Sequence, residues 1–143
     1  MTESFTSGRT DDGPSLDFIH KAIILVVSIP EYFDEPLSEA TIRRLVDAEF
    51  GDMVKFVVDL DREVLCVGGE FHSDEETILL EKGSKQENLW GANFYPDRPE
   101  GKKLVYTSMI NVRSREGNMK QEIQSPRIRE QVALLAKKYF GSI

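Results

Sequence analysis

Two short runs rich in β-branched and aromatic residues restrict the fold of this chain most strongly. Met53–Val58 and Glu63–Val67 are separated only by Asp59-Leu60-Asp61-Arg62. Such a short connection with acidic residues in it is typical of the turn between two antiparallel strands. The pattern therefore predicts a β-hairpin at the centre of the chain.

Two longer helices are predicted from their end signals. Ser38 is a typical N-cap, apolar residues follow it at helical spacing, and Gly51 lies where a glycine commonly ends a helix. Ser125 is a second N-cap, and Pro126 occupies the first helical position that proline favours. Apolar residues at helical spacing continue this second helix to about Gly141.

A shorter helix is predicted between them. Ser73 and Glu76 have the spacing of a capping box, with serine as the cap and glutamate three residues later. The apolar run that follows is short, so a strand over Thr77–Leu80 stays open as an alternative.

Three further segments predict strands. Ala22–Ile29 is a continuous β-branched run, which suits a strand covered on both faces. Leu104–Val112 alternates over a greater length. Leu89–Tyr95 also alternates, and one face of it would carry Trp90, Ala92 and Phe94. The order β-α-β-β-(α)-β-β-α predicts an α+β fold, with a mostly antiparallel sheet of about five strands, two longer helices and one short helix. The helices are expected on one face.

Length and composition predict one domain. The chain has 143 residues, 40% of them hydrophobic and 30% charged, as in a folded globular protein. Residues 1–17 are polar and cannot bury enough apolar surface to offset the entropy of ordering, so they are expected to form a disordered lead. Residues 18–143 are expected to form a single α+β domain.

The charge balance and the single cysteine exclude several classes of protein. The formal net charge is −7, which works against contact with nucleic-acid phosphates and anionic membranes. Cys66 is the only cysteine, so no intrachain disulfide can form. Its place inside a predicted strand favours a buried, inert thiol. No apolar run has the length of a membrane span and no signal-peptide pattern begins the chain, so a cytoplasmic location is expected.

The first candidate site follows the Gly68-Gly69 pair. Glu70, His72 and Asp74 offer carboxylate and imidazole groups close together, and these are ligands that divalent metals accept. Their spacing matches no standard zinc signature. The structural alternative places the acidic residues at a helix N-terminus, facing its dipole, with His72 on the surface.

The second and third candidate sites are rich in hydrogen-bond donors. Lys85, Gln86 and Asn93 lie around the only tryptophan, but Ile78 replaces the upstream glycine of a P-loop, which excludes that nucleotide site. Asn111 and Arg113 begin a locally basic loop that suits an anionic group. The alternatives are a capped turn for the first set and solvated loop charges for the second.

Several of these motifs together resemble an uncharacterised family of short prokaryotic proteins, a domain of unknown function. The similarity covers about Leu37 to Phe140, and Ser114 stands where the family pattern has proline. The motifs are GDMVK…VVD from Gly51, GGE-x-H from Gly68, GSKQ-x-x-LWG-x-N-x-YP from Gly83, and IN-x-R…GN from Ile110. The resemblance implies no activity, cofactor or catalytic residue.

Three hypotheses of function follow. The first is a binding or regulatory domain that holds a polar or anionic small molecule, or a protein partner, through Glu70, His72, Lys85, Gln86, Asn93, Asn111 and Arg113. The second is a hydrolase that uses a divalent metal bound by Glu70, His72 and Asp74, with Arg113 stabilising negative charge. The third is a subunit of a larger assembly, including a homo-oligomer, with the strand Leu104–Val112 or the last helix as the contact.

Overall fold

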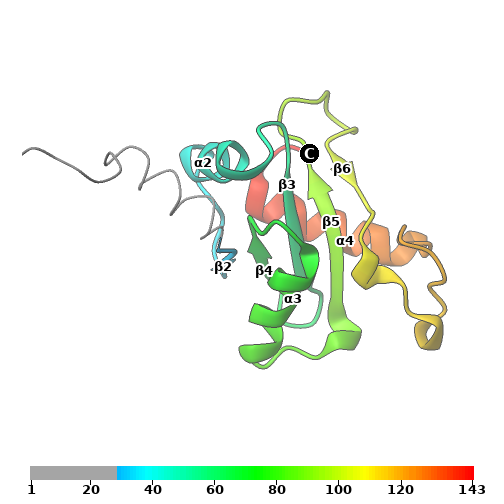
Figure 1. Ribbon diagram of the computed structural model, residues 1–143. Coiled ribbons are helices and arrows are strands. Elements are labelled where there is room, and N and C mark those ends of the chain that lie inside the picture. The colour runs from blue at the N-terminus through cyan, green and yellow to red at the C-terminus, as the bar shows by residue number, and fades with distance from the viewer. Residues whose placement is uncertain (1–28) are drawn as a thin grey trace, which may run out of the picture.

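A five-stranded antiparallel sheet forms the centre of the structure, a computed structural model that describes residues 29–143 (Figure 1). Each neighbouring pair of strands is antiparallel. In spatial order the strands are β2 (Glu31–Phe33), β4 (Val64–Val67), β3 (Val54–Asp59), β5 (Leu89–Phe94) and β6 (Leu104–Val105). The α+β class and the predicted element order are confirmed. The expected lead over residues 1–17 and all but the last residue of the expected strand Ala22–Ile29 lie outside the described residues.

The predicted hairpin is confirmed as β3 and β4. Its turn is held by the carboxylate of Asp59, whose Oδ1 accepts hydrogen bonds from the backbone N–H groups of Asp61 and Arg62, both at 2.9 Å. Glu63 has a φ of 57°, a left-handed conformation that returns the chain into β4. An aspartate that bonds the backbone two and three residues ahead is a common way to close a turn.

Helices cover both faces of the sheet, so the expectation that they lie on one face was wrong. Figure 1 shows α3 (His72–Glu81) on one side of the sheet and α4 (Pro126–Phe140) on the other. Side chains of α2 (Glu39–Glu49) join those of α4 in the larger core, whereas Leu79 of α3 packs in a second, smaller core. Consecutive residues of β4, such as Leu65 and Cys66, belong to different cores. Because the central strands are apolar on both faces, both must be covered.

The ends of the two longer helices are as predicted. Ser38 caps α2 by accepting from Thr41 N at 3.1 Å, and Ser125 caps α4 by accepting from Ile128 N at 3.2 Å. Gly51, which follows α2, has a φ of 87°, a conformation that costs glycine little. Local end signals therefore located these helices correctly.

The short helix starts earlier than its predicted cap. It runs over His72–Glu81, its N-cap residue is Phe71, and no side chain caps it. Ser73 lies inside the first turn, where its carbonyl accepts from Thr77 Oγ1 at 2.9 Å. Thus the capping box at Ser73 and the alternative strand over Thr77–Leu80 were both wrong.

The long strand predicted over Leu104–Val112 is only two residues long in the structure. After β6 the chain makes a bridge at Thr107, then the 3₁₀ turns η2 (Met109–Asn111) and η3 (Ser114–Glu116). A further 3₁₀ turn, η1 (Gln86–Asn88), precedes β5. Among the described residues no helix has both the length and the apolar character needed to cross a membrane.

Candidate functional site

The side chain of Asn111 takes the place of a neighbouring strand along part of β5. Its Nδ2 donates to the carbonyl of Gly91 at 2.9 Å and its Oδ1 accepts from the N–H of Gly91 at 2.9 Å. The same Nδ2 also donates to the carbonyl of Gln121 at 3.0 Å. Asn111 is 0% exposed, and its donors and acceptor are all used. An amide side chain therefore satisfies the backbone of β5 beyond the end of β6.

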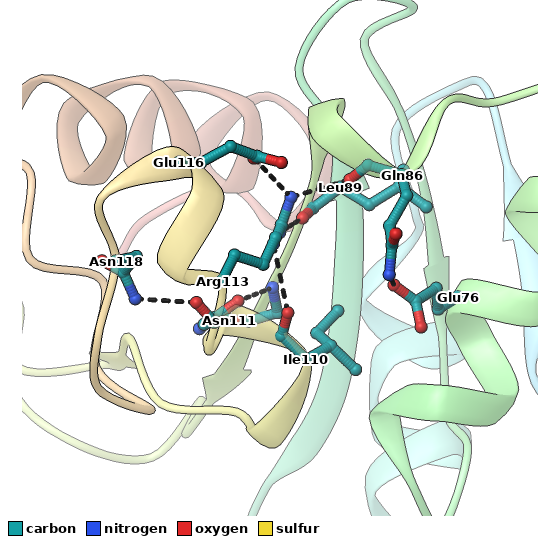
Figure 2. Close-up of polar contacts among 9 residues, drawn as sticks. Glu76, Gln86, Leu89, Ile110, Asn111, Arg113, Glu116 and Asn118 are labelled. Carbon is teal, nitrogen blue, oxygen red and sulfur yellow. Dashed lines mark hydrogen bonds and ion pairs between the residues drawn. The ribbon is translucent and has the colours of Figure 1, made fainter.

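Arg113 bonds β5 at Leu89, two residues nearer the start of the strand than Gly91 (Figure 2). Its Nη2 donates to the carbonyl of Leu89, its Nη1 to the carbonyl of Gln86 at 2.7 Å, and its Nε to the carbonyl of Ile110 at 3.2 Å. Glu116 accepts from Nη1 at 3.1 Å. Burial lowers the pKa of Arg113 from its ordinary value, and the charge of Glu116 opposes that shift. The donors of this guanidinium are therefore used by carbonyl groups of the domain itself and by Glu116.

The Arg113 guanidinium also lies over the ring of Trp90, 4.1 Å from its centroid. A cation over an indole face gains electrostatic attraction from the ring. The tryptophan of the LWG motif and the arginine of the IN-x-R motif therefore form one structural unit.

Asn118 closes the loop that carries Asn111. Its Nδ2 lies 2.8 Å from the carbonyl of Asn111, 2.8 Å from that of Lys120 and 3.0 Å from that of Glu122. Its Oδ1 accepts from Gln124 N at 2.8 Å. Figure 2 shows the contact of Asn118 with Asn111. The backbone groups of Asn118 and Arg113 bond each other at 2.7 and 3.0 Å, and we call the three residues the Asn111–Arg113–Asn118 network.

A separate cavity of about 590 Å³ lies on the α3 side of the sheet. It is bounded by the first turn of α3, by β3 and β5, and by the irregular segment after β6. We call it the His72–Asn93 cavity. It is lined by Lys55, Phe71, His72, Ser73, Asn93, Thr107, Ser108, Met109, Ile110 and Gln121.

His72 is held against β5 in a fixed orientation. Its side chain is 6% exposed, and its Nε2–H donates to the carbonyl of Ala92 at 2.8 Å. Burial lowers the pKa of His72 to about 4. Hydrogen bonding to Ala92 and the nearby polar side chain of Asn93 oppose this shift, and the charge of Lys55 reinforces it. The ring is therefore neutral near pH 7. Because the hydrogen bond places the proton on Nε2, Nδ1 carries a lone pair.

Asn93 brings a buried, unpartnered polar atom to the cavity wall formed by the described residues. It is 9% exposed, and its Nδ2 donates to the carbonyl of Thr107 at 3.3 Å. Its Oδ1 is buried and has no hydrogen-bond partner among residues 29–143. Lys55 on β3 is its cross-strand partner, so the two side chains start from neighbouring positions on the same face of the sheet.

Gly91 allows the walls of this region to approach β5 closely. A Cβ atom at this position would lie 2.7 Å from Oγ of Ser108 and 3.1 Å from Cδ2 of His72. The first distance leaves no room for a methyl group, and the second would require the His72 ring to shift by a few tenths of an ångström. The glycine of the LWG motif thus permits both α3 and the segment after β6 to pack against the strand.

Two other buried groups of the central segment lie outside the cavity lining. Glu75 is 0% exposed rather than facing solvent, and its Oε2 accepts from the N–H of Gly69 at 2.8 Å. Burial raises the pKa of Glu75 well above its ordinary value. Cys66 is fully buried in β4, and burial raises the pKa of its thiol, as expected for an inert cysteine.

The sequence candidates separate into three groups in the structure. His72 and Asn93 line one cavity. Asn111 and Arg113 belong to the internal network. Glu70, Lys85 and Gln86 are exposed and line no part of the His72–Asn93 cavity.

The proposed metal ligands do not form a recognisable centre. Within the described part of the chain, no group of three or more His, Cys, Asp or Glu side chains could hold a metal ion. Glu70 and Asp74 are exposed, whereas His72 is buried with Nε2 bonded to a carbonyl. Glu70, His72 and Asp74 are therefore not brought together.

Sequence reasoning missed five polar residues of the cavity. The alternation predicted for β5 already placed Asn93, a sequence candidate, on the face opposite Trp90. Pairing Asn93 with Lys55 required the register between β3 and β5, which no local pattern specifies. The missed residues are Lys55, Ser73, Thr107, Ser108 and Gln121.

A second surface cavity, of about 720 Å³, lies near the start of α4. Its lining includes the carboxylates of Asp61, Glu87 and Glu116 together with Arg127. None of the three buried side-chain atoms that lack partners among residues 29–143 belongs to its lining. The His72–Asn93 cavity is therefore the stronger candidate site.

Comparison with known proteins places the chain in a family without assigning an activity. Neither the curated proteins nor the solved structures gave a match. A family model described as a protein of unknown function, DUF5674, matches residues 31–139. The matched region includes the hairpin, the His72–Asn93 cavity and the Asn111–Arg113–Asn118 network. The chain belongs to the DUF5674 family.

Proposed function

We propose that this domain binds a small polar molecule in the His72–Asn93 cavity. The observation that carries the proposal is Asn93 Oδ1, a buried acceptor in the wall of a cavity that has no hydrogen-bond partner among residues 29–143. An unsatisfied buried polar atom costs about 1–3 kcal/mol. A ligand that donates a hydrogen bond to this atom would recover part of that cost.

The surroundings of Asn93 support a binding role. His72 is neutral and fixed by its bond to Ala92, so it offers a positioned lone pair on Nδ1. Lys55 supplies a positive charge from the neighbouring strand. A few fixed polar groups in a concave site with apolar walls are typical of small-molecule sites.

The metal-dependent hydrolase receives less support from the geometry. Its three metal ligands are not gathered, and Arg113 is bonded to the carbonyls of Leu89 and Gln86 rather than turned toward the cavity. Binding without chemistry therefore remains the better account of the described residues.

A fragment screen tests the proposal. The ¹⁵N-labelled protein is titrated with a mixed set of small carboxylates, amides, amines and polyols. We expect at least one compound to shift the amide resonances of Asn93 and its cavity neighbours and to raise Tm. Asn93→Ala should weaken binding of that compound and so reduce both effects.

Gln86→Ala is the matched control, because Gln86 is an exposed amide outside this cavity. It should bind the compound as the unaltered protein does. If no compound perturbs the cavity resonances, or if Asn93→Ala binds with the same affinity, the proposed site is wrong.

A further inference from the structure

The charge of the His72–Asn93 cavity differs from that of the whole chain. Its ten lining residues include one lysine and no carboxylate, in a protein with a net charge of −7. His72 adds no negative charge and is neutral near pH 7. Glu70 and Asp74 neighbour the lining in sequence but are not part of it. The formal charge that a ligand meets inside the cavity is therefore that of Lys55.

The first turn of α3 adds partial positive charge on the same side. Phe71 is the N-cap, and no side chain caps this ten-residue helix. The N–H groups of a helix start point away from the helix and favour negative groups. Ser73, in this turn, lines the cavity and brings a hydroxyl group as well. The same turn also carries Asp74 and Glu75, but neither lines the cavity. Inside the cavity, the helix start and Lys55 together favour an anion.

Asn93 selects among anions. Its Nδ2 donates to the carbonyl of Thr107, and the atom that has no partner in the described part of the chain is the acceptor Oδ1. An acceptor repels a bare carboxylate oxygen and attracts an O–H or N–H group. Lys55 is the cross-strand partner of Asn93, so the two side chains start from neighbouring positions on one face of the sheet. The Lys55 ammonium lies over the Phe50 ring, 5.5 Å from its centroid, and its charge also acts on His72 in the cavity wall. A ligand that satisfies both must carry a donor close to its anionic group.

The rim of the cavity is apolar. Phe71 is 56% exposed and Met109 is 73% exposed, and both line the cavity together with Ile110. Exposed aromatic and methionine side chains around a polar floor suit a ligand with an apolar substituent.

We propose that the His72–Asn93 cavity binds small carboxylates that carry a hydroxyl or N–H group beside the carboxylate, together with an apolar substituent. This inference rests on the proposed function and specifies its ligand class. The carboxylate would lie between Lys55 and the start of α3, and the adjacent donor would bond Asn93 Oδ1. The apolar group would contact Phe71 and Met109.

Matched probes separate the two recognition elements. 2-Hydroxy-4-methylpentanoate has the charge, the donor and the apolar group; 4-methylpentanoate lacks the donor; 2-hydroxy-4-methylpentanamide lacks the charge. N-acetylleucine carries an N–H donor in place of the hydroxyl. Dissociation constants are measured by following the cavity amide resonances. We expect the hydroxy acid or N-acetylleucine to bind at least tenfold more tightly than the probes that lack the donor or the charge.

Variants then assign each preference to its residue. Lys55→Met should weaken the binding of the carboxylates about tenfold and leave the binding of the amide unchanged. Lys85 is an exposed lysine outside the cavity, so Lys85→Met should change neither affinity. Asn93→Ala should reduce the hydroxy acid to the affinity of 4-methylpentanoate. Comparison of each variant's own Tm with that of the unaltered protein shows that it is folded.

The outcomes distinguish the two proposals. If the amide or a simple amine binds the cavity best, and Lys55→Met has no effect, the ligand class is wrong while the binding site stands. If no probe or fragment of any class shifts the cavity resonances, both proposals fail. If the carboxylates bind and their affinity depends on both Lys55 and Asn93, both proposals are supported.

Discussion

Asn93 lies in β5 and Asn111 lies beside it; both are buried, but only Asn111 has all its polar side-chain atoms hydrogen-bonded within the described chain. Asn111 bonds both backbone groups of Gly91 and the carbonyl of Gln121. Asn93 makes one long bond to Thr107 and leaves Oδ1 without a partner in the described chain. Buried polar groups are normally all hydrogen-bonded. Asn111, whose polar atoms are all bonded, is therefore part of the scaffold. Asn93, with its unpartnered oxygen, marks the candidate site.

The largest expected effect comes from breaking the satisfied region at Arg113. Arg113→Ala removes the donors for the carbonyls of Leu89 and Gln86 and leaves them buried, so we expect a loss of about 3 kcal/mol or more in the free energy of unfolding. Arg113→Lys should recover little, because an ammonium cannot reproduce the planar fork. Urea unfolding measures both.

Arg115→Ala is the control for this change, since Arg115 is exposed in the same loop. It should alter stability by less than about 0.5 kcal/mol. Equal destabilisation by the Arg113 and Arg115 variants would contradict a structural role specific to Arg113.

The second largest expected effect on stability is the difference between substitutions at Asn111 and at Asn93. Asn111→Ala should cost about 2–3 kcal/mol, because it leaves backbone groups of Gly91 and Gln121 without partners. Asn93→Ala should change stability by less than about 1 kcal/mol, because it removes one 3.3 Å bond together with an unsatisfied oxygen. The denaturant midpoints of the two variants measure this difference. Equal losses of stability in the two variants would refute it.

The smallest expected effect is a pH dependence from His72. Its folded pKa, about 4, lies below the ordinary histidine value, so the unfolded chain binds the proton more readily. The stabilisation by neutral His72 is present above about pH 6.5 and is lost as the pH falls toward 4. Relative to His72→Gln, the unaltered protein should lose roughly 1–2 kcal/mol between pH 7 and pH 5.

The difference from the variant is the informative quantity, because Glu75 acts in the opposite direction. Its raised folded pKa stabilises the protein below the ordinary glutamate value, and that contribution is lost as the pH rises through the folded pKa. A difference between the two proteins that stays constant with pH would show that His72 titrates normally in the fold.

Local signals in the sequence were sufficient for much of the fold. The caps at Ser38 and Ser125, the glycine at Gly51 and the central hairpin were predicted correctly, because neighbouring residues determine each of them. The position of Trp90, Ala92 and Phe94 in one core was also predicted from their alternation.

The errors arose where distant contacts overrode local patterns. Leu104–Val112 alternates like a strand, but Asn111 and Arg113 bond β5 through their side chains and the backbone turns instead. Helix α3 starts at His72 rather than at the predicted cap. The side chain of His72 is held by its bond to Ala92, a contact between distant residues that no local pattern specifies. For the same reason the sequence indicated His72 and Asn93 but not the other polar residues that share their cavity.

The Asn111–Arg113–Asn118 network has a consequence for solubility. All six residues of β5 are buried, and β6 pairs only with Asn93 and Phe94 at one end of it. Without the side chains of Asn111 and Arg113, the remaining backbone groups of β5 would form an open strand edge that another chain can extend. These two side chains therefore protect the domain against intermolecular β-sheet growth, and their loss would be seen as aggregation during refolding.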